Sequence, residues 1–324
     1  MSSGLAIPLF LVSLAVTLAA ARTFAIRLDR LGVRFGFPEA LIGLLTALAA
    51  DGPEISSALF ALAQGAHNVS VGVLVGSNAF NLAAMIGVSG LLAGCVALPR
   101  ATMLLEGLPG AVVTLIAVAL LLQWIDAGLA AVLAGIVIVP YVVLVIRGRG
   151  AASGGEEAAG EPGGRERSAE PRPDHPVRGL LALIVVDVGL IVAGSAGMVQ
   201  AGLTLGDNLH LSRTVLGVLV LAPLTSIPNA VTGVRLGRAG RSAALVGETF
   251  NSNTINLAFG VIAPSLFVTL GSVSATGKAE LAWLIAMTLL TLLMLGRRRG
   301  MGRPGAAAII ALYLGFIALQ LASA

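Results

Sequence analysis

Residues 50–83 read ADGPEISSALFALAQGAHNVSVGVLVGSNAFNLA, and residues 225–258 read TSIPNAVTGVRLGRAGRSAALVGETFNSNTINLA. The second stretch matches the first without a gap, at a constant offset of 175 residues. Among the identical positions are Pro53, Gly72, Ser77, Asn78 and Asn81, which fall on a proline, a glycine, a serine and two asparagines of the second stretch. Helix breakers and polar groups that recur at matching places in apolar segments are typical of secondary transporters.

The composition is that of a membrane protein. Of 324 residues, 57% are hydrophobic and 11% are charged, and the mean hydropathy is +0.96. A soluble fold of this length has no means of burying so much apolar surface. Ten segments are long enough to cross a hydrocarbon core of roughly 30 Å. They are 4–25, 37–62, 70–94, 101–122, 126–146, 179–199, 212–235, 242–268, 279–296 and 304–322.

Positive charge falls almost entirely on one side of these segments. When the loops are assigned alternately to two sides, all but two of the 20 Lys and Arg residues share a side, the exceptions being Arg213 and Lys278. The positive-inside rule places that side in the cytoplasm and both termini outside, and we expect the membrane to be the cytoplasmic membrane of a prokaryote. The same asymmetry explains the basic pI, so we expect no nucleic-acid partner. The partners expected are the lipid bilayer and inorganic cations, with the oligomeric state left open.

The segment count sets the relation between the two copies. Five crossings precede the second copy, so the halves run in opposite senses and form an inverted repeat. The predicted fold is an all-α polytopic membrane protein with ten transmembrane helices in two inverted repeats of five, of which helices 2 and 7 are broken. The first repeat covers 1–147 and the second 178–324. The segment 148–177 is rich in Gly, Ala, Pro and mixed charge, which predicts a flexible cytoplasmic linker.

The first polar patch contains two acids inside an apolar segment. Asp51 and Glu54 lie three residues apart, so on a helix they would share a face. Pro53 between them removes a backbone donor and predicts a break in the helix. A carboxylate at mid-membrane depth costs about 2.5 kcal/mol or more and usually faces a cavity or a partner. Free carbonyls and side-chain oxygens at such a break are hard ligands that suit Na⁺, Ca²⁺ or Mg²⁺.

The other polar patches offer neutral oxygens and one further acid. The matching break in the second half has prolines at 223 and 228, and each following segment has a Ser and an Asn one helical turn apart on one face. Such small polar residues also serve helix packing in membranes, but their recurrence in register favours a joint ion site. The residues of that site beyond the first break are Ser77, Asn81, Thr225, Ser226, Asn229, Glu248, Ser252 and Asn256. Asp51, Glu54, Asn81 and Asn256 are the predicted metal ligands.

Two other acids lie in apolar segments. Glu106 is about two turns from Arg100, which favours an interfacial position over a ligand role. Asp187 lies near the middle of segment 179–199 and is a candidate partner of the site or proton carrier, but its repeat mate Val12 is apolar.

The four patches resemble those of the calcium:cation antiporter superfamily, which includes the sodium/calcium exchangers. That family has approximately G-T-S-x-P-E in the second helix of each half and G-N-x-x-G-S-N-x-x-N in the third. This chain has AADGPE at 49–54, GVLVGSNAFN at 72–81, LTSIPN at 224–229 and GETFNSNTIN at 247–256. The resemblance implies broken helices that bind cations near the membrane centre, and two outer helices that move to alternate access. It implies no cofactor beyond the transported cations, such as Ca²⁺ or Na⁺.

The chain departs from the family pattern at the residues that carry charge. The family's second Glu is Asn229 here, and the first Thr and Ser are Ala50 and Asp51. Tight Ca²⁺ binding calls for about two carboxylates at the ion, and at the family positions only Glu54 supplies one. Asp51 and Glu248 restore the charge if they face the same cavity.

Three functions stay open from the sequence. The first is a secondary antiporter that exchanges Ca²⁺ against Na⁺ or H⁺ by alternating access. The second is exchange of a monovalent cation, Na⁺ or K⁺, against H⁺. The third is a membrane relative of the exchangers that does not transport. We expect no enzyme, because the sequence shows no His or Cys cluster, no Gly-rich phosphate loop and no Ser/His/Asp set.

Overall fold

The structure, a computed structural model, describes residues 3–37, 39–147 and 177–322, and most of these residues are helical. The first half contains α1 (Ser3–Arg34), α2 (Glu39–Ala50), α3 (Gly52–Ala63), α4 (His67–Asn81), η1 (Leu82–Val88), α5 (Ser89–Ala93), α6 (Arg100–Leu121) and α7 (Ala127–Ile146). The second contains α8 (Val177–Asn208), α9 (Arg213–Val215), η2 (Leu216–Leu221), α10 (Ala222–Thr225), α11 (Ile227–Arg238), α12 (Ser242–Leu257), η3 (Ala258–Ile262), α13 (Ala263–Ser265), α14 (Ala275–Leu295) and α15 (Arg303–Ala322).

The segments η1, η2 and η3 are π-helical. The first begins directly after Asn81, and the third begins two residues after Asn256, the repeat mate of Asn81. The strands among the described residues are β1 (Cys95–Val96) and β2 (Met301–Gly302), which pair antiparallel. The predicted linker lies outside the described residues except for Val177, which begins α8. Apart from these two short strands, the regular structure of the described residues is helical, which confirms the predicted helical class.

Seven helices in the described ranges are long and apolar enough to cross a membrane, and a bent pair raises this to eight. The pair is Arg213–Thr225 with Ile227–Arg238, and the helix axis bends by 51° between the two parts. Two of the ten expected segments are not among them. Segment 37–62 is divided at Asp51 into two helices of 12 residues each, and segment 242–268 carries the polar residues from Glu248 to Asn256. Among the described residues, the structure thus has seven or eight helices that are long enough to span a membrane.

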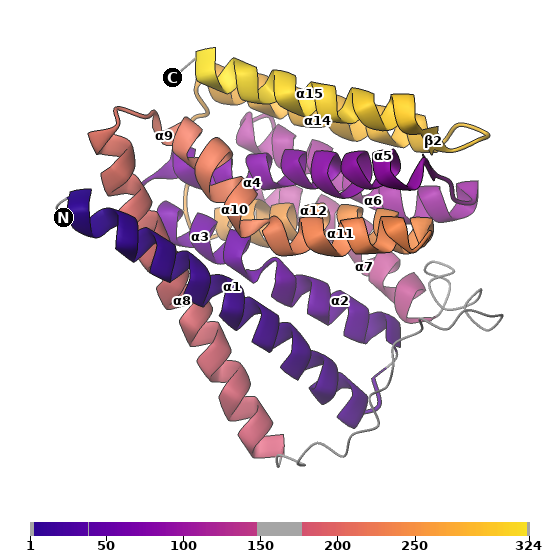
Figure 1. Ribbon diagram of the computed structural model, residues 1–324, viewed down its shortest axis with the longest axis horizontal. Helices are drawn as coiled ribbons and strands as arrows, with labels where there is room; N and C mark the ends of the chain where they lie inside the picture. Colours follow the sequence, from indigo (N-terminus) through magenta and orange to yellow (C-terminus); the bar gives the residue numbers. More distant parts are fainter. Residues whose placement is uncertain (1–2, 38, 148–176, 323–324) are drawn as a thin grey trace.

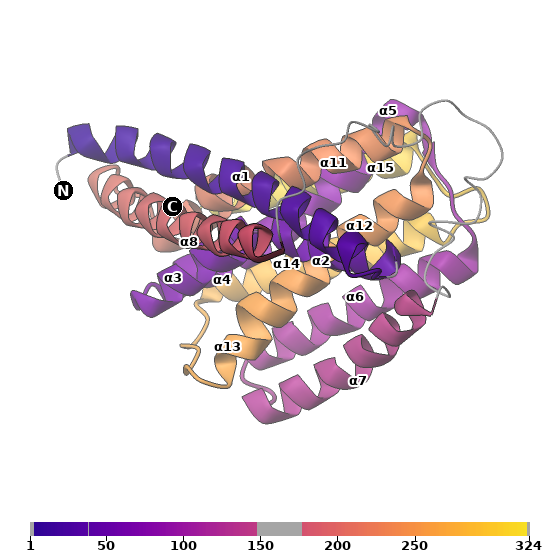
Figure 2. The ribbon, with the colours of Figure 1, turned by 90° about the horizontal axis from the view of Figure 1, so that it is seen from below.

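The helices α1 and α8 form a flank of their own, side by side (Figures 1 and 2). Each has 32 residues, which gives a length of about 48 Å. The expected segments 4–25 and 179–199 ended too early, because polar residues at 26–34 and 200–208 continue both helices instead of starting loops. Both helices are therefore longer than the hydrocarbon core.

Asp187 belongs to this flank. Its Oδ1 accepts a hydrogen bond from Thr23 Oγ1 of α1 at 2.8 Å and forms an ion pair with Arg27. Arg27 also donates to the Leu183 carbonyl at 3.1 Å. Asp187 is 2% exposed, so α1 and α8 are joined by a buried acid. The hypothesis that Asp187 partners the ion site finds no contact of that kind here.

The centre of the bundle depends on close backbone contact between α4 and the η2–α10 segment. A Cβ on Gly76 would lie 2.8 Å from Ala222 Cβ and 2.9 Å from Val218 Cα, and one on Gly217 would lie 2.7 Å from the Val69 carbonyl oxygen. Small residues allow helices in membranes to approach in this way. The contact brings polar residues of the first half against those of the second.

Candidate ion site

The helix is interrupted at both predicted breaks. The interruptions fall at Asp51 and Ser226, which are related by the repeat offset, and their backbones are nearly identical, with φ/ψ of −79°/−3° and −85°/1°. Pro53 and Pro228 follow two residues later, so in each case the amide that would bond the carbonyl four residues earlier is missing. The two breaks therefore have the same geometry but different side chains.

Asn229 of α11 connects the two acids of the first break. Its Nδ2 is 2.8 Å from Asp51 Oδ1, 3.4 Å from Glu54 Oε1 and 3.1 Å from Ser252 Oγ. Ser226 donates to Glu54 Oε1 at 2.9 Å, and Ser252 donates to Asp51 Oδ1 at 2.6 Å. All five residues are at most 2% exposed. One oxygen of each carboxyl group receives these bonds, and every donor is neutral.

Four asparagines of α4 and α12 form a second part of the site, with matched contacts across the halves. Asn78 Nδ2 donates to the Asn253 backbone carbonyl at 3.2 Å, and Asn253 Nδ2 donates to that of Asn78 at 3.1 Å. Asn81 Nδ2 donates to Asn253 Oδ1 at 3.1 Å, and Asn256 Nδ2 donates to Asn78 Oδ1 at 3.3 Å. The amide nitrogens of Asn81 and Asn256 are thus held by the side-chain oxygens of Asn253 and Asn78, respectively.

These contacts leave four buried oxygens without a hydrogen-bond partner: Asp51 Oδ2, Glu54 Oε2, Asn81 Oδ1 and Asn256 Oδ1. Each of the four residues has no exposed surface. Buried polar atoms are nearly always paired, and a free one needs an explanation. Carboxylate and amide oxygens are the ligand types that suit a hard cation such as Ca²⁺ or Na⁺. The four free oxygens belong to the four residues predicted as metal ligands.

The remaining predicted residues lie around this centre. Ser77 Oγ is 3.5 Å from the Ala222 carbonyl, and Thr225 donates to the same carbonyl at 3.1 Å, so both hydroxyls meet at the second break. Glu248 is half-buried on α12, one turn before Ser252. Its carboxyl group interacts electrostatically with that of Asp51. Glu248 therefore adds negative charge beside the two acids.

A further acid lies next to Gly247 of α12. Glu106 is 4% exposed, and its Oε2 accepts a hydrogen bond from the Tyr141 hydroxyl at 2.8 Å. That hydroxyl is also 2.6 Å from Asn251 Oδ1 on α12. A Cβ on Gly247 would lie 3.2 Å from Glu106 Oε2. Glu106 is therefore buried between α6 and α12, where Gly247 leaves space for it.

Sequence reasoning missed the structural part of Asn78 and Asn253. Both stand out as identical positions of the repeat, and that identity was the available signal. Their side chains bond each other and the neighbouring asparagines instead of ending in free oxygens. They orient the predicted ligands.

Comparison with known proteins gives one family and one characterised fold. A family model described as sodium/calcium exchanger protein matches residues 5–147 and 179–322. CaxA of Alkalimonas amylolytica, whose assigned activity is that of an antiporter, is 24% identical over 312 residues, which cover 94% of this chain and 95% of CaxA.

The fold is similar to solved structures of the sodium-calcium exchanger NCX_Mj. For that protein soaked with 10 mM Na⁺ and 10 mM Sr²⁺, the TM-score is 0.64 at 20% identity, over 98% of this chain and 99% of the other. For the same exchanger soaked with zero Na⁺ and Ca²⁺, the TM-score is 0.60 at 20% identity, with the same coverage.

Proposed function

The chain belongs to the sodium/calcium exchanger protein family, and on this premise we propose that it exchanges Ca²⁺ against Na⁺ or H⁺ across the membrane. Members of the family are transporters and not enzymes. The ion binds between the first break, α4, α11 and α12, at the four free oxygens of Asp51, Glu54, Asn81 and Asn256. The other predicted residues complete or orient this site.

The observation that carries the proposal is the position of Asp51. In this chain the family's second Glu is the neutral Asn229. Asn229 Nδ2 bonds Asp51 Oδ1 and approaches Glu54 Oε1, so Asp51 brings a second carboxylate to the same point. About two carboxylates suit tight binding of a hard dication. The charge lost in one half is thereby supplied by the other.

The proposed topology has ten crossings in two inverted halves, 1–147 and 178–324, with both termini outside. Support comes from the matched breaks at Asp51 and Ser226, from the reciprocal asparagine bonds at the repeat offset, and from the charge asymmetry of the loops. A polar segment such as α12 crosses the membrane here because its polar side chains face protein and not lipid. Alternating access then proceeds by movement of α1 and α8 as one unit, which the buried Asp187 contacts hold together.

A second candidate is exchange of Na⁺ or K⁺ against H⁺. Asn229 favours it, because a site that has lost one family carboxylate attracts a dication less. In this case one of the two acids carries the proton and the other stays with the ion.

The deciding experiment is flux in liposomes that contain the purified protein. We expect labelled Ca²⁺ uptake that depends on an opposing Na⁺ or H⁺ gradient and is lost in Glu54→Gln, which keeps the side-chain volume. Asp126→Asn, at the exposed start of α7, is the control and should transport normally. Monovalent flux without Ca²⁺ flux supports the second candidate. No flux of any cation, with retained cation binding, supports a relative that does not transport.

A further inference from the structure

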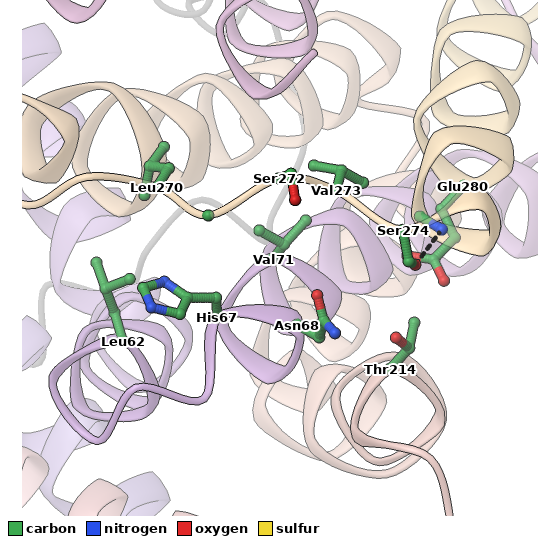
Figure 3. Close-up of a pocket in the computed structure, with 12 residues that line it drawn as sticks. Leu62, His67, Asn68, Val71, Thr214, Leu270, Ser272, Val273, Ser274 and Glu280 are labelled. Carbon is green, nitrogen blue, oxygen red and sulfur yellow. Dashed lines mark hydrogen bonds between the residues drawn. The ribbon is translucent and has the colours of Figure 1, made fainter. Parts of the chain in front are cut away.

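A pocket lies apart from the ion site, at the end of the bundle where α4 begins, and both apolar and polar side chains line it. It is bounded by His67 and Asn68 of α4, Thr214 of α9, the segment 270–274 and Glu280 of α14, and its volume is about 20 Å³ (Figure 3). A cavity of roughly 10–15 Å³ or more can hold one water-sized occupant. Ser274 is occupied as the cap of α14, since its Oγ accepts from Gly277 N at 3.1 Å.

A much larger polar opening shares part of its lining with this pocket. The opening has a volume of about 660 Å³, and its walls come from residues 64–68, the end of α8, Arg213 and the segment 271–272. His67, Asn68, Gly271 and Ser272 line both spaces. Asn68 and Ser272 are exposed, whereas Glu280 is 1% exposed. The pocket therefore leads from an open, polar entrance to a buried acid.

The acid at the inner end of the pocket has an unpartnered oxygen. Glu280 Oε1 is buried without a hydrogen bond. Gln320 of α15 is 0% exposed and interacts with Glu280 through its side chain. A free polar atom on a buried side chain is costly in a helical bundle. A bound cation that is coordinated by the free oxygen removes this cost.

We propose that Glu280 is the charged ligand of an accessory Na⁺ site in this pocket, distinct from the transport site. The neutral side-chain oxygens that line the pocket with it are those of Asn68, Thr214 and Ser272. One carboxylate with neutral oxygens balances a single positive charge, whereas tight binding of Ca²⁺ requires more acid ligands. Within the described residues no three His, Cys, Asp or Glu side chains come together as a metal-binding group.

The accessory site is separated from the transport site along α4. Asn68 and Ser77 are nine residues apart on this helix, which corresponds to about 14 Å. The same helix thus carries one site at its first turn and the other near its end. Loss of one site leaves the ligands of the other in place, so the two sites are separable by mutation.

The test is equilibrium binding of labelled Na⁺ to the purified full-length chain, with choline replacing Na⁺ at constant ionic strength. We expect Glu280→Gln to lose one Na⁺-binding component that Glu54→Gln retains. Asp126→Asn, which removes an exposed carboxylate outside both sites, should keep this component. Thr214→Val keeps Glu280 and should weaken the component several-fold, which covers the case in which Glu280→Gln does not fold.

Two results would overturn the proposal. One is an unchanged amount of bound Na⁺ in folded Glu280→Gln together with unchanged affinity in Thr214→Val. The other is loss of all Na⁺ binding in Glu54→Gln, which would place every ion at the transport site. Failure of transport in the liposome experiment does not affect this outcome, because the accessory component is read from binding alone.

Discussion

Asn78 and Asn253 each donate the side-chain amide to the backbone carbonyl of the other, at 3.2 and 3.1 Å. The two residues occupy the same position in the two copies of the repeat. Their Oδ1 atoms accept from Asn256 and Asn81, respectively. Because the amide nitrogens of these two ligands are held, their Oδ1 atoms are the ends that stay free for the ion.

Removing the Asn78 side chain should affect stability and ion binding together. Asn78→Ala leaves the Asn253 carbonyl without this donor and Asn256 Nδ2 without its acceptor. Each unsatisfied buried group costs about 1–3 kcal/mol, so we expect a lower unfolding temperature and weaker cation binding. Thermal unfolding with and without Ca²⁺ measures both effects. Asn208→Ala, at the exposed end of α8, is the control, and equal behaviour of the two variants would contradict the role of Asn78.

A second prediction concerns Asp51, which supplies the carboxylate that the family has at the position of Asn229. In Asn229→Glu a carboxylate replaces the donor that lies 2.8 Å from Asp51 Oδ1, so like charges meet in a buried site. We expect Ca²⁺ transport to fall about tenfold or more, which corresponds to about 1.4 kcal/mol. The double variant Asp51→Ser with Asn229→Glu moves the acid to the family position and should recover transport. The measurement is Ca²⁺ flux in liposomes. A double variant that transports no better than the single variant would contradict the idea that Asp51 replaces the family's second Glu.

The repeat predicted where two helices break and which polar residues are buried beside the breaks. A constant offset placed the breaks at Asp51 and Ser226 and the polar pairs of α4 and α12 in register, and all four predicted metal ligands end in a free buried oxygen. A helical period tells which face a side chain occupies. It does not tell which residue of the other half faces it, so the crossed bonds of Asn78 and Asn253 were not predictable.

Contacts between helices decide two features that local composition does not show. Glu106 is buried because the missing side chain of Gly247 leaves a place for it. Polar residues after position 25 suggested a loop, but α1 continues to Arg34 because it packs along α8. In both cases contacts between helices distant in sequence decided the outcome over local composition.

Glu248 should tune cation affinity without being essential. It is half-buried, and its interaction with Asp51 is electrostatic. We expect Glu248→Gln to weaken Ca²⁺ binding about two- to fivefold, the size typical of a partly solvated charge pair. The effect should shrink at high ionic strength because salt screens such pairs. Binding isotherms at low and high salt check this, and complete loss of binding would make Glu248 a direct ligand instead.

The Asp187 contacts should hold α1 to α8 as a unit. Asp187→Asn removes the charge that faces Arg27 and leaves a partly buried cation, because the Arg27 side chain is 24% exposed. Breaking a buried ion pair costs about 3–5 kcal/mol, and the partial exposure of Arg27 places the expected loss near the lower end. The double variant Arg27→Gln with Asp187→Asn removes both charges and should recover much of the stability. Unfolding in detergent of the unmodified protein, Arg27→Gln, Asp187→Asn and the double variant gives the coupling between the two residues. Additive losses would show that the ion pair does not join the helices, whereas a coupled result with slower ion flux in Asp187→Asn would connect this contact to the movement of the flank.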